Sequence, residues 1–258
     1  MNIIGIIPAR MGSSRFPGKP MAKILGVPML GHVYFRSKMS KAMKEVYIAT
    51  CDQEIVDYAN SIGAKAIMTK DTHERASDRT AEAMLKIEEQ TGEKADIVVM
   101  IQGDEPMVFP EMIDMAIKPM VDDSSIISVN LMAPLKTKEE HEDLNEPKVV
   151  VDKQNFALYF SREPIPSRKK WDGKGKLPML KQVCIMPFSR EGLIKFNELE
   201  PTPLEIIESI DMNRFLEHGY KVKMVLEDYE TYSVDTPADR DRVEEAMKND
   251  PLLNQYKK

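Results

Sequence analysis

The chain has 258 residues, of which 42% are hydrophobic and 30% are charged, so it can bury a large core as a globular protein. Its net charge of -6 at pH 7 argues against a protein that binds nucleic acid or anionic membranes. No apolar run approaches the ~20 residues of a membrane span, and no signal peptide precedes the first predicted strand, so we expect a cytoplasmic protein.

The first motif is the stretch from Ile3 to Lys19, which reads IIGIIPARMGSSRFPGK. A short apolar run that ends in turn residues predicts a buried strand that delivers a loop to the edge of a sheet. Three cations, Arg10, Arg15 and Lys19, lie on this loop among small residues, and cations beside free backbone N–H groups suit a polyphosphate. A lysine after Pro-Gly can also be an ordinary solvated turn residue, but the RxxxxRxxxK spacing favours phosphate binding.

The first half of the chain alternates between predicted strands and helices. We predict strands at 45–50, 66–68 and 96–101, and helices at 29–43, 53–61 and 79–90. Such alternation implies right-handed crossovers and an α/β fold, with a Rossmann-like, mainly parallel sheet covered by helices on both faces. Ligands bind beyond the carboxyl ends of such strands, so the opening loop should meet the loops at 69–78 and 102–106 in one site.

The second half has a different pattern. Strands are expected at 126–132, 182–188 and 222–226, and helices at 189–196 and 203–218. Residues 149–152 and 156–160 flank a turn and predict a β-hairpin. Residues 167–176 are basic and contain glycine, which suggests a loop or lid. A last helix should begin near Pro237, with Thr236 or Asp235 as its cap.

Two acidic residues follow predicted strands, namely Asp104 in QGDEP and Asp235 in SVDTP. An isolated aspartate after a strand is commonly a turn former or a helix cap. Beside a phosphate loop, however, two carboxylates from distant segments could hold Mg²⁺, which takes one or two carboxylates together with phosphate oxygens. This set of groups suits nucleotidyl transfer, in which charge accumulates on the phosphoryl and leaving oxygens. The absence of GxxxxGK[ST] and GxGxxG argues against a P-loop kinase and an NAD dehydrogenase.

Taken together, the motifs resemble the 3-deoxy-manno-octulosonate (Kdo) cytidylyltransferases, or CMP-Kdo synthetases. The resemblance runs from about Ile3 to Met247 and is carried by IIPARMGSSRFPGKP, VMIQGDEPMV, PKVVVD, ALYFSREPIP, PTPLEIIE and YSVDTPAD. It implies the nucleotide-diphospho-sugar transferase fold, with CTP and a sugar acid giving a CMP-sugar and pyrophosphate. It further implies Mg²⁺ as the cofactor, a part in lipopolysaccharide and other cell-envelope polysaccharide synthesis, and a homodimer formed through the hairpin region, 149–166.

The resemblance also assigns roles by position. It implies a single domain over 1–250, with a nucleotide-binding half at about 1–125, a sugar-binding and dimerisation half at about 126–230, and a tail at 251–258. Catalysis would rest on Lys19, Arg10, Asp104 and Asp235, the two aspartates binding the metal. The nucleotide would contact Pro8, Ala9, Arg10, Arg15, Lys19, Arg75, Ser77, Arg79 and Gln102. The acceptor would contact Gln102, Tyr159, Ser161, Arg162, Gln182, Glu205 and Glu208.

Some positions depart from the family's pattern, mainly on the acceptor side. Gln182 replaces a histidine, Met186 replaces a tyrosine, and Ile206 stands where a polar residue is usual. Arg75 and Ala76 are departures in the segment that would read the cytosine. Because polar groups decide which acceptor fits, the acceptor could instead be an amino-substituted Kdo, a nonulosonic acid or a phosphonate. A catalytically silent nucleotide-binding homologue is a further alternative.

Overall fold

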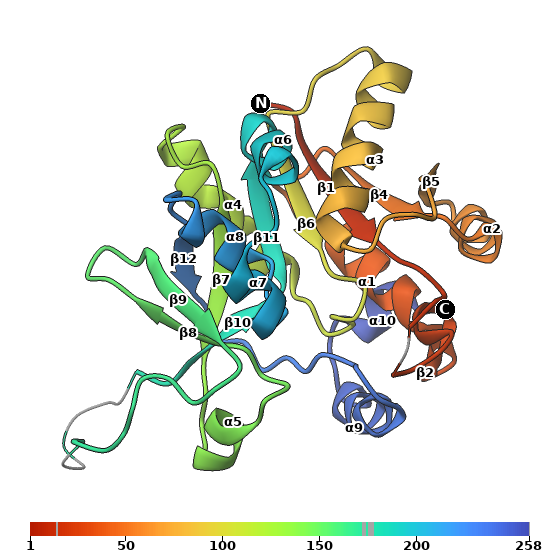
Figure 1. Cartoon of the computed structure of the whole chain (residues 1–258). Helices are drawn as coiled ribbons and strands as arrows, with labels where there is room; N and C mark the ends of the chain where they lie inside the picture. The colour runs from red at the N-terminus through yellow and green to blue at the C-terminus, as the bar shows by residue number, and fades with distance from the viewer. Residues whose placement is uncertain (14, 172–173, 175–177, 258) are drawn as a thin grey trace. The chain divides into compact units, whose positions relative to one another are not determined.

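A computed structural model describes residues 1–13, 15–171, 174 and 178–257 of the chain (Figure 1). The chain divides into two compact units, which we call unit 1 (Met1–Asp114 and Glu230–Lys258) and unit 2 (Met115–Tyr229). The loop expected at 167–176 lies partly outside the described residues, at 172–173 and 175–176. Among the described helices, none is long and apolar enough for a membrane span.

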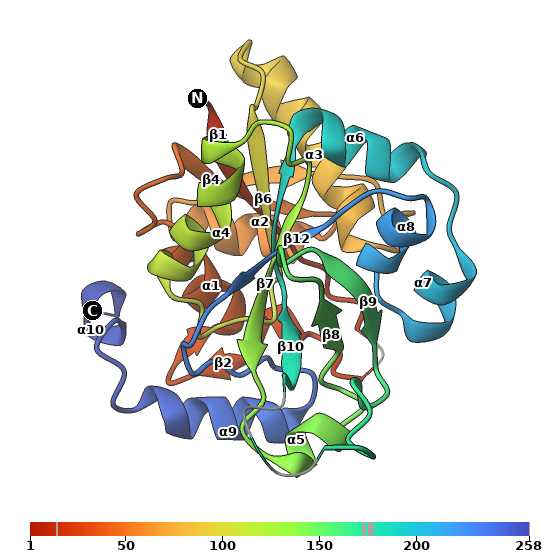
Figure 2. The ribbon, with the colours of Figure 1, turned by 90° about the vertical axis from the view of Figure 1, so that its left-hand side faces the viewer.

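Unit 1 contains a parallel sheet in which four strands follow the order β6-β1-β4-β5. Its strands and helices are β1 (Ile3–Pro8), α1 (Met29–Ser37), β4 (Glu45–Thr50), α2 (Gln53–Ser61), β5 (Lys65–Met68), α3 (Ala76–Thr91) and β6 (Ile97–Ile101). The chain moves in one direction from β1 to β5 and then turns back to β6. Right-handed crossovers therefore place α1 and α3 on opposite faces, as Figure 2 shows. The predicted mainly parallel sheet is confirmed.

The remainder of unit 1 packs the two ends of its chain together. It comprises η1 (Lys19–Met21), β2 (Lys23–Ile24), β3 (Val27–Pro28), α9 (Pro237–Met247) and α10 (Leu253–Tyr256), while α4 (Pro110–Asp122) spans the division between the units. One apolar cluster joins Ile24 and Met29 with Val234, Val243 and Met247. This cluster anchors the segment after Lys19 against the segment that carries Asp235.

A buried polar network holds the C-terminal segment. The guanidinium of Arg36 is fully buried and ion-pairs with Asp250, and its Nε donates to the hydroxyl of Tyr256 at 3.0 Å. The Tyr256 hydroxyl lies 2.8 Å from Nδ1 of His32, whose Nε2 lies 2.8 Å from the carbonyl oxygen of Ile24. Within the segment predicted as a tail, these contacts hold α10 at Leu253–Tyr256.

Unit 2 contains a mixed sheet with the order β12-β7-β10-β8-β9, in which β12 and β7 are parallel and the other described pairs are antiparallel (Figure 2). The expected hairpin is present: Asp152 Oδ1 accepts from the backbone N–H groups of Gln154 and Phe156, and Asn155 takes φ 59°. The elements are β7 (Val129–Pro134), α5 (Lys138–Glu142), β8 (Lys148–Val151), β9 (Ala157–Ser161), β10 (Leu180–Val183), β11 (Ile185–Ser189), α6 (Arg190–Glu198), α7 (Pro203–Glu208), α8 (Met212–Glu217) and β12 (Lys223–Leu226).

Several predicted bounds in unit 2 were wrong. The single helix expected at 203–218 is two helices, because Ser209 takes a left-handed conformation (φ 53°) and the side chain of Arg162 donates to the carbonyl oxygen of Glu208 at 2.7 Å. That carbonyl would otherwise accept a bond from the next turn of the helix. The strand expected at 182–188 is likewise two strands, β10 and β11, separated at Cys184.

Candidate nucleotidyl-transfer site

The ammonium group of Lys19 is the centre of the candidate site in unit 1. Its Nζ donates to Asp104 Oδ2 at 2.9 Å, to Asp235 Oδ1 at 3.2 Å and to the carbonyl oxygen of Val234 at 2.9 Å. Lys19 begins η1, Asp104 follows β6, and Asp235 precedes α9. Three residues that are distant in the sequence, and that the sequence predicted to act together, therefore meet around one nitrogen atom.

The segment of Asp235 is fixed by its neighbours on both sides. The backbone N–H of Val234 donates to the carbonyl oxygen of Asp104 at 2.9 Å, which ties the two acidic segments together. Thr236 then caps α9, because its side chain accepts from the N–H of Asp239 while the Asp239 carboxylate accepts from the N–H of Thr236 at 2.8 Å. This capping box confirms Thr236 as the cap. Asp235 therefore has a rigid backbone on which to present its carboxylate.

The turn after β6 passes close to the end of β1. A Cβ atom on Gly103 would lie 3.1 Å from the carbonyl oxygen of Pro8, so the absence of a side chain permits this approach. Gln102, next to this glycine, is half-buried, and Ala9 is buried with its N–H donating to Ala49 at 2.9 Å. The predicted contacts at Pro8, Ala9 and Gln102 thus lie at the carboxyl ends of adjacent parallel strands.

The electrostatic environment keeps Lys19 charged. Burial alone would lower the pKa of its ammonium group, but the carboxylates of Asp104 and Asp235 raise the pKa above its ordinary value. Arg15 adds a second and more exposed cation to the site. Its Nη2 lies 3.0 Å from Asp235 Oδ1. Arg10 is exposed and makes no hydrogen bond or ion pair within the part of the chain that the structure describes. Arg10 therefore remains available to an incoming anion.

In the segment expected to read the base, the helix α3 begins earlier than predicted. We expected a loop through Asp78, but α3 starts at Ala76, with Arg75 at its N-cap in an extended conformation. Ser77 and Arg79 are consequently buried in the first turn of α3. Arg79 Nη1 donates to the side chain of Thr69 and, at 3.2 Å, to the carbonyl oxygen of Lys70. Its Nη2 is buried without a hydrogen-bond partner among the described residues.

Glu82 is a positioning residue that the sequence did not reveal. One carboxylate oxygen accepts from the backbone N–H of Lys70 at 3.0 Å and pairs with His73, and the other contacts Lys86 at 2.8 Å. Burial would raise the pKa of Glu82, but the hydrogen bonds from Lys86, Lys70 and His73 lower it to about 2. These contacts pin the loop before α3. No motif spacing indicates them, because they depend on how the loop folds back onto the helix.

Four residues predicted to bind the acceptor meet in unit 2. Glu208 Oε1 accepts from the hydroxyls of Tyr159 and Ser161, both at 2.8 Å, and its Oε2 accepts from the backbone N–H of Arg162 at 2.8 Å. Burial would raise the pKa of Glu208, but these hydrogen bonds lower it below its usual value, so the carboxylate is ionised at neutral pH. The structure thus places Tyr159, Ser161, Arg162 and Glu208 in one cluster.

Of the other three predicted acceptor residues, Gln102 lies in unit 1, and Glu205 and Gln182 lie in unit 2 in different surroundings. The carboxylate of Glu205 is fully buried and forms a two-pronged ion pair with Arg214, at 2.8 Å and 2.7 Å. This pairing favours a structural role for Glu205. Gln182 is also buried, and its amide donates to the side chain of Asn130 at 2.6 Å.

Two lysines outside the predicted site share a row with Ser161. Lys148 pairs in register with Ser161 on one side and with Lys181 on the other, and residues in register share a face of the sheet. Lys148 is fully buried, and its Nζ donates to the carbonyl oxygen of Asp143 at 2.7 Å. Burial lowers the pKa of Lys148 despite nearby acidic groups. Cationic groups therefore lie beside the predicted acceptor residues.

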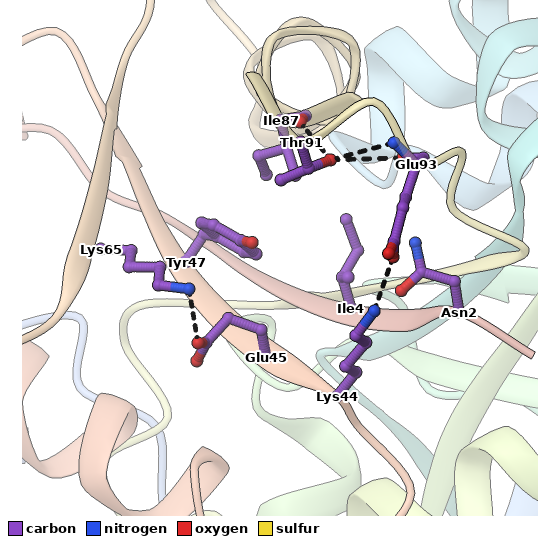
Figure 3. A pocket seen from close by; sticks show the side chains of 9 residues that line it. All are labelled: Asn2, Ile4, Lys44, Glu45, Tyr47, Lys65, Ile87, Thr91 and Glu93. Atoms are coloured by element: carbon purple, nitrogen blue, oxygen red, sulfur yellow. Dashed lines mark hydrogen bonds and ion pairs between the residues drawn. The ribbon is translucent and has the colours of Figure 1, made fainter. Parts of the chain in front are cut away.

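A pocket in unit 1 lies away from these residues (Figure 3). Its lining comes from the amino ends of β1, β4 and β5 and from the end of α3, whereas Lys19 and Asp104 lie beyond the carboxyl ends of strands. The charged groups there pair with each other, as Lys65 does with Glu45 at 2.8 Å and Lys44 does with Glu93. We assign no part of nucleotide binding to this pocket.

Comparison with known proteins gives one consistent result. The family model described as cytidylyltransferase matches residues 4–229. The 3-deoxy-manno-octulosonate cytidylyltransferase of Geotalea uraniireducens is 41% identical, over 96% of this chain and 100% of its own length. The mitochondrial enzyme of that name from Arabidopsis thaliana is 38% identical, over 95% of this chain and 83% of its own.

Solved structures agree. A structure of CMP:2-keto-3-deoxy-manno-octonic acid synthetase complexed with CTP is 35% identical, covers 96% of this chain and 98% of its own, and has a TM-score of 0.87. A 4-diphosphocytidyl-2C-methyl-D-erythritol synthase from Anaerococcus prevotii is 13% identical with a TM-score of 0.61, over 96% of this chain and 99% of its own, and shows a shared fold.

Proposed function

Because the chain belongs to the family of 3-deoxy-manno-octulosonate cytidylyltransferases, we propose that it transfers the cytidylyl group of CTP to a Kdo-like sugar acid. A hydroxyl group of the acid loses its proton to water as its oxygen attacks the α-phosphorus of CTP, the bond to pyrophosphate breaks, and the products are a CMP-sugar and pyrophosphate. The observation that carries this proposal is the meeting of Lys19, Asp104 and Asp235 beyond the carboxyl ends of parallel strands, in a chain 41% identical to a relative of that name.

Unit 1 holds the residues that would bind the nucleotide. Lys19 and Arg15 would neutralise the triphosphate, where negative charge accumulates as pyrophosphate leaves. Arg10, exposed and unpaired within the described chain, would reach the phosphates from solvent. The partnerless Nη2 of Arg79 offers a buried donor for a carbonyl group, which supports a role in reading the base.

Asp104 and Asp235 fit a magnesium ion, which would complete the nucleotide side of the site. Both carboxylates are about three-quarters buried, come from segments joined by a backbone hydrogen bond, and already share one cation. Mg²⁺ prefers such oxygen ligands and takes its remaining ligands from phosphate and water. No group of three or more acidic, histidine or cysteine ligands occurs among the described residues, as suits an ion shared with the nucleotide. When bound, Mg²⁺ would neutralise charge on the phosphate oxygens.

Unit 2 holds the residues that would bind the acceptor. The ionised Glu208, with Tyr159 and Ser161 around it, can accept hydrogen bonds from sugar hydroxyls. Lys181 shares the row of Ser161 and ion-pairs with Glu146 at 3.2 Å, and an acceptor that carries a carboxylate would compete with Glu146 for this cation. A different acidic acceptor remains the second candidate, because Gln182 stands where the family has histidine and its amide is engaged by Asn130.

The proposal is tested by pyrophosphate release from CTP, Mg²⁺ and a panel of acids that includes Kdo, amino-substituted Kdo, nonulosonic acids and phosphonates. We expect turnover with Kdo, and loss of at least about 100-fold in the Lys19→Met variant. Lys23→Met is the matched control, since Lys23 is an exposed lysine on the next strand. Turnover with another acid alone would replace Kdo as the acceptor, while CTP binding without turnover on any acid would indicate a silent homologue.

Two further properties belong to the proposal. We expect a homodimer formed through the hairpin region, 149–166, and the exposed side chain of Leu158 on β9 is an apolar group that such a contact could cover. We also expect the enzyme to act in the cytoplasm. Sedimentation of the purified protein tests the dimer, and a monomer at micromolar concentration would contradict it.

A further inference from the structure

The hydrogen bonds of Lys19 use every donor that its side chain has. A lysine ammonium group has three N–H bonds, and Nζ has three acceptors: Asp104 Oδ2, Asp235 Oδ1 and the carbonyl oxygen of Val234. The side chain is only 14% exposed. Lys19 therefore cannot donate to a phosphate until it releases one of its present acceptors.

The same two carboxylates cannot serve the ammonium group and a metal ion equally. A divalent cation that approached Asp104 and Asp235 would meet a positive charge already held between them, in a partly buried place where charges are weakly screened. Negative phosphate groups would change this balance, because they can accept the ammonium and the metal ion together. The ammonium group would then exchange a carboxylate for a phosphate oxygen.

The surrounding backbone makes movement of Lys19 the simplest exchange. Val234 is fully buried and its N–H is bonded to Asp104, while Asp235 is followed by the capping box of α9. The backbone that carries the two short aspartate side chains is therefore held in place, whereas the longer lysine side chain has four rotatable carbon–carbon bonds that let its ammonium group move further. Arg15 also contacts Asp235, but its side chain is 54% exposed and solvent weakens that contact.

We propose that Lys19 is an internal counter-cation that competes with divalent metal for Asp104 and Asp235, so that metal binds weakly alone and is admitted together with the nucleotide phosphates. This inference rests on the proposed metal role of the two aspartates. It makes metal and nucleotide binding cooperative, and by linkage each ligand strengthens the other equally. It also gives Lys19 a second role besides charge neutralisation of the triphosphate.

The test measures binding of Mn²⁺, without nucleotide, to the full chain by electron paramagnetic resonance of the free ion. We expect Lys19→Met to bind Mn²⁺ about tenfold more tightly than the wild type, within the 5- to 150-fold range typical of coupled sites. Lys23→Met should match the wild type. The double variant Lys19→Met with Asp235→Asn should lose the gain, which would locate the ion between the two carboxylates.

Equal or weaker Mn²⁺ binding by a folded Lys19→Met variant would overturn the inference. If Lys19→Met does not fold, as judged by circular dichroism, Lys19→Gln keeps a polar side chain while removing the charge, and the same gain is expected. The proposed function fails separately: a tenfold gain in Mn²⁺ affinity without pyrophosphate release on any acid would leave the competition standing and refute the transferase activity. Pyrophosphate release without the gain in Mn²⁺ affinity would support the transferase activity and refute the competition between Lys19 and the metal ion.

Discussion

We expect acid to destabilise unit 1 through a single buried histidine. His32 is fully buried, and its Nε2 must carry the proton because the carbonyl oxygen of Ile24 can only accept. Nδ1 is therefore the acceptor for the hydroxyl of Tyr256, and a second proton there would face a group that already receives a hydrogen bond from Arg36. Burial, aided by the charge of Arg36, lowers the pKa of His32 from 6.5 to about 4.

The size of the effect follows from linkage. The folded-state pKa of His32 is depressed, so its contribution to stability is fully present above pH 6.5 and is lost as the pH falls toward 4. One pKa unit corresponds to about 1.4 kcal/mol, so pH 5 should lower the free energy of unfolding by about 2 kcal/mol through this histidine. That loss is a large part of the ~5–15 kcal/mol stability of an ordinary domain.

A buried carboxyl group in unit 2, that of Glu227, makes stability depend on pH in the opposite direction to His32. Burial raises the pKa of Glu227 to about 7, despite the hydrogen bond from the N–H of Tyr229. The stability from a raised pKa is present below the unfolded value of 4.5 and is lost as the pH rises through 7. As the pH falls from about 7 toward 4.5, acidification therefore stabilises the fold through Glu227 while it destabilises the fold through His32. Because these two effects oppose each other, the free energy of unfolding of the wild type should change little with pH through this pair of residues. The effect of His32 is therefore measured in the Glu227→Gln variant.

The assay is urea unfolding at pH 7.5 and pH 5 of Glu227→Gln and of the double variant Glu227→Gln with His32→Gln. Other titrating carboxylates are common to both chains and cancel. We expect the single variant to lose about 2 kcal/mol more than the double variant on acidification. An equal loss in the two variants would refute the assignment of a neutral, depressed His32.

Three further outcomes follow from contacts described above. Asp250→Asn should cost about 3–5 kcal/mol in urea unfolding, because it leaves the buried guanidinium of Arg36 without its counter-charge; a cost below 1 kcal/mol would contradict this. Gly103→Ala should lower kcat severalfold at a stability cost of about 1–2 kcal/mol, since the new methyl would press on the carbonyl oxygen of Pro8 at 3.1 Å; unchanged kcat would count against a close fit there. Glu208→Gln should raise the KM for the acceptor about tenfold and leave the KM for CTP within twofold, and steady-state kinetics with each substrate varied would expose an equal effect on both.

The parallel sheet of unit 1 could be predicted because its signals are local. Runs such as 97–101 are apolar throughout and end in turn residues, and alternation with helices leaves few possible topologies. The errors arose where a distant group decides the outcome. The end of α7, for example, depends on the side chain of Arg162, which lies 46 residues earlier in the sequence.

The candidate site divides in the same way. The sequence could predict that Lys19, Asp104 and Asp235 share a site, because each lies within a recognisable motif next to the end of a strand or the start of a helix. Glu82 and Lys148 could not, because their roles depend on the backbone groups that happen to face them after folding. The ion pair between Glu205 and Arg214 could not be predicted either, since nothing in the PLEIIE motif indicates which way its first glutamate points.

The division of unit 1 into two pieces of chain has a consequence for protein synthesis. A ribosome makes residues 1–114 first, then the whole of unit 2, and only afterwards the segment at 230–258. Until that segment emerges, the nascent unit 1 lacks Asp235 and two partners of Arg36, Asp250 and Tyr256. Since domains generally fold as units during translation, unit 1 must finish folding after unit 2 has been made. A chain interrupted before residue 235 would therefore carry Lys19 and Asp104 without the second carboxylate that Lys19 contacts in the complete chain.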